Sequence, residues 1–159
     1  MKWLMGWLMI CGSGLLHAES ENITVPDNPK WKEECGSCHV AYPPQLLTSG
    51  DWQRLMGKLD QHFGTNATLE PGDNREILDF LRDNSGTAWG GKSSDSGLRV
   101  SDTQWFIRKH RKISIKIWMD AAVKTAANCP ACHVNAERED WSRQSIHIPI
   151  PGGKVQEGN

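Results

Sequence analysis

Two short motifs hold the residues of this chain whose types and spacing could do chemistry. Both read C-x-x-C-H: the first contains Cys35, Cys38 and His39, and the second contains Cys129, Cys132 and His133. Two thiols at this spacing can each form a thioether with one vinyl group of a haem, and the adjacent histidine is then placed as the proximal iron ligand. The motifs therefore predict two covalently attached c-type haems.

Paired cysteines have two other common uses. Four cysteines can form a zinc site in which each C-x-x-C pair supplies two ligands, and a single pair can be a thioredoxin-like redox centre. Zinc binding gives no reason for a histidine directly after both pairs. A redox pair is expected in a βαβ context, which the sequence lacks. Haem attachment is the favoured interpretation, with zinc as the main alternative.

The first eighteen residues have the pattern of a secretory signal. Lys2 supplies a positive start, residues 3–16 form an apolar run broken only by Gly, Ser and Cys, and Ala18 precedes the acidic Glu19. The run is short and interrupted for a membrane span, although an uncleaved anchor stays an alternative. Cleavage also removes Cys11, which leaves only the four motif cysteines.

The charge of the exported chain argues against nucleic acid as a partner. Removal of residues 1–18 takes away one of 18 basic residues and none of 19 acidic ones, which leaves a net charge of −2. No basic stripe is available to neutralise phosphates. A slightly acidic surface is compatible with docking to a positively charged patch on another redox protein.

Short helices are the elements expected to hold the first motif. We predict helices over 31–40, stopped by two prolines, and over 51–63, with Ser49 as its cap and Gly64 as its stop. A third helix should begin at a capping box formed by Asp73 and Glu76 and end near Asn84. The fold is therefore predicted to be mainly α.

The second half has a weaker helical pattern. Ser101 and Gln104 form another capping box, and the helix they start should carry His110 in line with Phe106. Residues 113–117 alternate like a strand and also continue a helical stripe, so both alternatives stay open. A short helix is expected to run from the second motif towards Trp141, and the proline-containing tail 146–151 should be extended.

A Gly- and Ser-rich stretch, 85–97, divides the two motifs. It predicts a signal peptide over 1–18, an N-terminal haem domain over 19–92 and a C-terminal haem domain over 93–159.

The distal position of each iron also needs a donor. His62 and His110 lie on predicted apolar helical faces, where a histidine is usually an ordinary core residue. Two irons that each need a ligand shift the balance towards ligation. His62 follows His39 by 23 positions, and His110 precedes His133 by the same number. We therefore favour His62 and His110.

Three further side chains are weaker candidates for these positions. His147 alternates with two isoleucines in the extended tail and should point away from whatever they bury. Met56 belongs to an apolar stripe and is better explained as core, whereas Met119 is less easily explained. Methionine ligation would raise the reduction potential relative to ligation by two histidines.

Residues within and beyond the haem motifs resemble the bacterial dihaem cytochrome c family, over almost all of the chain after the signal. In the first half these are residues 34–39, 41–44, Trp52, 55–56 and 62–64; in the second they are 105–106, His110, Trp118, 123–124, 127–129, 132–133 and 148–149.

This resemblance implies a periplasmic electron carrier with two low-spin haems, each held by two histidines. It implies a small cytochrome c-like helical N-terminal half and a less regular haem-binding C-terminal half. The distal ligands carry over to His62 and His110, and local pairing of distal with proximal histidines is assumed. A membrane b-type cytochrome and a small oxygen-binding monohaem cytochrome are the implied redox partners.

The function expected from residues and resemblance together is single-electron transfer between proteins, without catalysis and without a small-molecule substrate. The alternative is a dihaem enzyme, such as a peroxidase or small-molecule reductase. Such an enzyme needs one iron with an open or displaceable ligand and a nearby acid–base group.

Overall fold

The computed structural model describes residues 23–86 and 98–150. The predicted signal peptide, the tail beyond residue 150 and the proposed boundary at 92/93 lie outside the described residues. The described part contains five helices and no strand. They are α1 (Pro29–Gly36), α2 (Ser49–Met56), α3 (Pro71–Asp83), α4 (Gln104–His110) and α5 (Ile115–Trp118). The prediction of a mainly α fold is confirmed.

Local capping explains where the first two helices begin. The side chain of Asn28 accepts a hydrogen bond from the Trp31 amide at 2.8 Å, with Pro29 in the first turn of α1. Thr48, not Ser49, caps α2. Helix α3 begins at Pro71, two residues before the predicted capping box, and ends as predicted beside Asn84.

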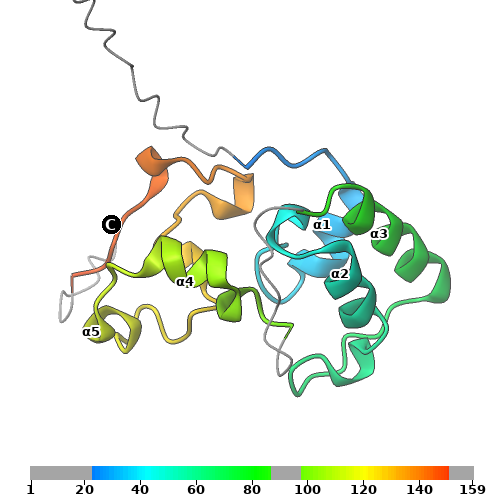
Figure 1. The fold of residues 1–159 in the computed structure, drawn as a ribbon, viewed down its shortest axis with the longest axis horizontal. Helices are drawn as coiled ribbons and strands as arrows, with labels where there is room; N and C mark the ends of the chain where they lie inside the picture. The colour runs from blue at the N-terminus through cyan, green and yellow to red at the C-terminus, as the bar shows by residue number, and fades with distance from the viewer. Residues whose placement is uncertain (1–22, 87–97, 151–159) are drawn as a thin grey trace, which may run out of the picture.

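Helices α1, α2 and α3 gather on one side of the molecule, and α4 and α5 lie on the other (Figure 1). The core between the first three contains Trp31, Leu47, Ile77 and Leu81, all less than 2% exposed. Val100 and Phe106 from the second half belong to the same buried cluster. The two motif-bearing halves therefore share apolar packing, which places their sites in one continuous body.

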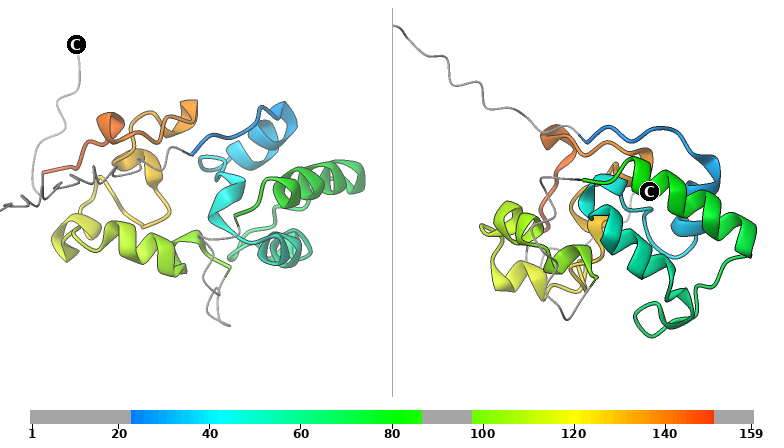
Figure 2. Two further views of the ribbon diagram at one scale, coloured as in Figure 1. Left: turned by 45° about the horizontal axis from the view of Figure 1, so that its top comes forward. Right: turned by 45° about the vertical axis from the view of Figure 1, so that its right-hand side comes forward.

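The second half is less regular, as Figure 2 shows. Residues 113–117 contain neither a strand nor a long helix, because α5 is a single turn that begins at Ile115. The helix predicted after the second motif is wrong: 3₁₀ turns occur at Cys129–Ala131, Ala136–Arg138 and Arg143–Ser145. The Val134 amide donates to the Ser145 carbonyl at 3.2 Å. This hydrogen bond joins the tail to the second motif. In a continuous helix the Val134 amide would instead have donated to a carbonyl within the helix.

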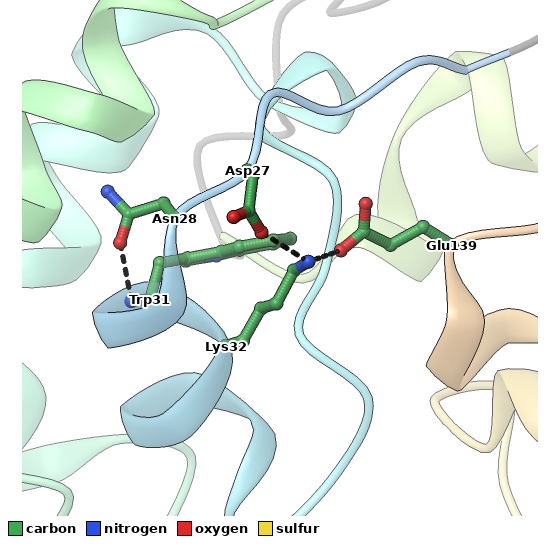
Figure 3. A network of polar contacts seen from close by, with 5 residues as sticks. All are labelled: Asp27, Asn28, Trp31, Lys32 and Glu139. Atoms are coloured by element: carbon green, nitrogen blue, oxygen red, sulfur yellow. Dashed lines mark hydrogen bonds and ion pairs between the residues drawn. The ribbon is translucent and has the colours of Figure 1, made fainter.

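An ion-pair network joins the first helix to the second half (Figure 3). The Lys32 ammonium group contacts Asp27 at 2.8 Å and Glu139 at 2.7 Å. Because Lys32 precedes the first motif by one turn and Glu139 closely follows the second, this network links the two segments that carry the motifs. None of the helices in the described ranges is long and apolar enough to cross a membrane.

Candidate haem sites

The first motif lies at the end of α1. The helix ends at Gly36, four residues before the predicted end, so Cys35 is in its last turn and His39 follows it. The Nδ1 atom of His39 lies 2.8 Å from the Val40 carbonyl oxygen. A carbonyl only accepts hydrogen bonds, so Nδ1 carries the proton and Nε2 keeps a lone pair available for a metal.

His62 reaches the same site through a turn, so its predicted place on a helix is wrong. Helix α2 ends at Met56, and a 3₁₀ turn at Leu59–Gln61 precedes His62. Six more helical residues would have moved the chain about 9 Å further along the α2 axis. Left-handed backbone at Phe63 (φ +50°) and Gly64 (φ +97°) then reverses the chain, and Gly64 tolerates this conformation without strain.

The two histidines of the first site face each other. Their ring centres are 6.2 Å apart and their planes differ by 23°. Because a metal–imidazole bond is about 2 Å long and the ring centre lies about 1.1 Å farther, two imidazoles on opposite sides of one metal have centres about 6.3 Å apart. The pair His39 and His62 therefore has the spacing that a six-coordinate haem iron requires.

A cavity of about 480 Å³ opens at this pair and includes all four candidate binding residues of the first site in its wall. Much of the remaining wall is apolar, as a porphyrin requires. Helices and turns of the first half supply Trp31, Leu47, Trp52, Met56, Leu59 and Leu81, and the second half supplies Val100 and Phe106.

The second site is built in the same way from different elements. His110 is the last residue of α4, and its Nδ1 atom lies 2.9 Å from the Phe106 carbonyl oxygen, which again leaves Nε2 free. The Phe106 ring stacks on the His110 ring with centres 4.0 Å apart, which agrees with their predicted alignment on one helix. The His133 ring centre is 6.2 Å from that of His110, with planes 68° apart. The structure thus places each distal candidate opposite the proximal histidine that is nearer to it in sequence.

Two buried donors at the second site have no partner among the described groups. They are Nδ1 of His133 and Nε1 of Trp141, whose rings are 5.5 Å apart. Buried polar groups are rarely left unpaired, so they indicate acceptors outside the polypeptide. The carboxylates of a haem supply acceptors of this kind.

The electrostatics of the sites favour metal ligation by neutral histidine. Burial lowers the pKa of His62 and of His133, and the facing histidine lowers each further. Neutral imidazole is the form that binds a metal.

The thiol chemistry disfavours the two alternatives for the motifs. Burial raises the pKa of Cys35 and of Cys129 to about 11, whereas a redox-active thiol needs a lowered pKa. Within the described ranges, which include all four motif cysteines, no three His, Cys, Asp or Glu side chains converge to hold a metal ion. A four-cysteine zinc site is therefore absent from this part of the chain.

Tyr42 connects the two sites, a role that sequence reasoning missed. Its ring stacks on His39 with centres 4.7 Å apart, and its hydroxyl donates to the Ala127 carbonyl at 2.9 Å. Burial raises the pKa of Tyr42, and the neighbouring Cys129 raises it further. One side chain therefore contacts a candidate iron ligand of the first site and the start of the second motif. The sequence signal that could have indicated a fixed position for Tyr42 is the rigid Pro43-Pro44 pair that directly follows it.

The remaining candidate ligands do not belong to the two histidine pairs. The side chain of His147 is exposed, and its amide donates to the Cys132 carbonyl at 2.8 Å. Met56 is buried in the shared core at 4% exposure, and Met119 is 79% exposed.

A helical body with two facing histidine pairs beside two C-x-x-C-H motifs has the construction of a haem-binding cytochrome. Comparison with known families agrees: the family described as Dihaem cytochrome c matches residues 31–141. The chain belongs to the dihaem cytochrome c family. It is accordingly a haem-based cytochrome, and its family has two haems.

Solved structures of similar proteins support the assignment. A diheme cytochrome c from Rhodobacter sphaeroides is 35% identical with a TM-score of 0.65, and the match covers 74% of this chain and 98% of that one. A diheme cytochrome c from Shewanella baltica OS155 is 32% identical with a TM-score of 0.65, over 79% of this chain and 95% of that one. No curated protein sequence gives a significant match.

Proposed function

We propose that this protein is an exported, periplasmic electron carrier that passes single electrons between redox proteins through two low-spin haems. Cys35 and Cys38 would attach one haem, and Cys129 and Cys132 the other. The observation that carries the proposal is the 6.2 Å separation of ring centres in both histidine pairs. This spacing supports occupation of both axial positions at each iron by His39 with His62 and by His133 with His110.

The haem supplies one-electron chemistry, and the chain controls its environment. Carbonyl oxygens of Val40 and Phe106 hold the protons of His39 and His110 on Nδ1, so that each Nε2 atom is oriented as a ligand. The apolar cavity wall limits the access of water to the first site. Orienting the ligands and excluding water do not require an acid–base group beside the iron.

The enzymatic alternative is less well supported. A peroxidase or reductase needs a vacant or displaceable axial position. In both sites the ring centre of a second histidine lies 6.2 Å from that of the first, so a donor for the second axial position is already in place. As partners we propose two redox proteins, for which the family resemblance suggests a membrane b-type cytochrome and a small oxygen-binding monohaem cytochrome.

Replacement of the distal histidines tests the proposal. His62→Ala and His110→Ala should each convert one haem to the high-spin state and leave the other low-spin, with carbon monoxide binding to one ferrous haem per chain. His147→Ala is the matched control and should keep both haems low-spin. Visible and magnetic circular dichroism spectra of both oxidation states report the spin states.

Carbon monoxide binding to the unmodified protein could contradict the proposal. Rapid binding of carbon monoxide to one of its two ferrous haems at neutral pH would show a displaceable ligand. The dihaem enzyme would then become the better proposal.

A further inference from the structure

Positive charge is concentrated around α4 and α5, although the whole chain is slightly acidic. Residues 98–124 contain seven Lys and Arg against two Asp, a net charge of +5. Residues 23–86 contain six Lys and Arg against ten Asp and Glu, a net charge of −4. Since α4 and α5 lie opposite the first three helices (Figure 1), the molecule has a basic side and an acidic side.

The basic side chains are exposed and are not neutralised by neighbours. Arg108, Arg111, Lys112 and Lys116 are all exposed. In the described part of the chain, none of these four takes part in an ion pair. Two lysines of the acidic side differ, because Lys30 pairs with Asp73 at 2.7 Å and Lys32 pairs with Asp27 at 2.8 Å. The uncompensated charges are therefore available to a partner.

Exposed apolar side chains lie among these cations. Ile107 is 50% exposed, Ile115 is 69% exposed and Met119 is 79% exposed. Ile107 and Arg111 are four residues apart along α4 and its end, as are Arg108 and Lys112, so apolar and basic groups stand side by side. Apolar contacts within a charged rim are typical of protein interfaces.

We propose that the α4–α5 face is the docking surface for a redox protein whose surface is acidic around its own cofactor. We define the face by Ile107, Arg108, Arg111, Lys112, Lys116 and Met119. It adjoins His110, the candidate distal ligand of the second haem, so electrons exchanged with this partner cross at the second site. The inference rests on the proposed carrier function and adds the chemistry of the partner and the site of exchange.

An acidic protein fits this face better than a membrane or a second copy. Amphipathic membrane anchors are generally much longer than α4 and α5, which have seven and four residues. The net charge of −4 on residues 23–86 would also be repelled by anionic lipid. A second copy could seat its acidic side on this face, but that would be a head-to-tail contact, which leaves a basic face free on one copy and extends into rings or filaments.

Charge-reversal variants of the haem-loaded protein test the proposal. Arg111→Glu/Lys112→Glu changes the face, and Lys58→Glu/Arg75→Glu makes the same charge change at exposed positions of the acidic side. The probe is an acidic flavodoxin hydroquinone, which loses one electron for each haem it reduces. Stopped-flow absorbance measures its rate at about 10 mM and about 500 mM salt, where charges are weakly and strongly screened.

We expect the face variant to be reduced at least about tenfold more slowly than the unmodified protein at low salt, and almost equally fast at high salt. The control should change about twofold or less. Equal slowing of both variants, or no slowing of the face variant, would overturn the proposal.

Other occupants have their own signatures. Salt-sensitive cosedimentation of the protein with phosphatidylglycerol vesicles, lost in the face variant, would overturn the proposal in favour of a membrane surface. Dimerisation at low salt, abolished by the face variant in sedimentation velocity, would overturn it in favour of a second copy. Low-spin spectra and unchanged reduction by dithionite in both variants would show that the carrier function survives even if the docking surface fails.

Discussion

Removal of one hydroxyl group tests whether the two halves act as one body. Tyr42→Phe keeps the aromatic ring that stacks on His39 and deletes the hydrogen bond to the Ala127 carbonyl. The two bonded residues are 85 positions apart, on opposite sides of the proposed domain boundary. The change therefore acts on the connection between the sites and leaves the haem ligands in place.

The size of the effect follows from the geometry. A hydrogen bond of 2.9 Å is well formed, and a typical one contributes about 0.5–1.5 kcal/mol to the free energy of unfolding. An acceptor left unpaired in a buried place costs about 1–3 kcal/mol. Because this bond is only partly buried, water can replace part of it, and we expect a loss of about 1–2 kcal/mol.

Guanidinium chloride unfolding of the haem-loaded protein measures this loss. With a slope of about 4 kcal/mol per molar for a small protein, the midpoint should fall by about 0.25–0.5 M. Ser114→Ala is the matched control, since its side chain is exposed and makes no capping hydrogen bond, and it should shift the midpoint by less than about 0.1 M. An unchanged midpoint in Tyr42→Phe would refute the reasoning that this bond ties the halves together.

Three further outcomes are expected. Denatured mature protein should keep two haems on a chain that begins near Glu19; mass spectrometry of a haem-free, zinc-bearing chain from a cytochrome-maturing host would contradict the haem assignment. Electron paramagnetic resonance should show two different low-spin signals, rhombic for the pair at 23° and strongly anisotropic for the pair at 68°; two identical signals would contradict these ring orientations. Lys32→Ala should leave the thermal and denaturant midpoints of unfolding nearly unchanged, because its side chain is 42% exposed and water screens its ion pairs; a clear drop in either midpoint would show that the ion pairs are better shielded from water than their exposure indicates.

Local sequence contains the signal for the candidate haem chemistry of this protein. Thioether attachment depends on two thiols and a histidine at a fixed short spacing, so the motifs could be identified without a fold. Helix existence was also local: Asn28 and Pro29 start α1 by capping, and Asn84 ends α3. The family match and the helical fold confirm the prediction of a mainly α dihaem protein.

Tertiary structure decided how the second histidine of each site arrives. Helical periodicity placed His62 on a continuous helix, because Leu59 and Phe63 fall on one stripe. The chain instead leaves the helix after Met56, passes through a 3₁₀ turn at Leu59–Gln61 and reverses at Phe63 and Gly64, and His62 then lies opposite His39. The contact between His62 and His39 joins residues that are far apart in sequence. A pattern read within one helix therefore does not predict it.

The same limit applies to what joins the halves. A Gly- and Ser-rich segment predicted a boundary between two haem-bearing halves. Across that boundary, Phe106 packs into the core that the first half supplies, and the Tyr42 hydroxyl reaches the Ala127 carbonyl. Composition indicates the local conformational preference of a segment. These contacts depend instead on where segments far apart in sequence meet. The basic α4–α5 face has a similar origin: its cations are visible in the sequence, but only the folded chain shows them unpaired, beside exposed apolar groups and next to His110.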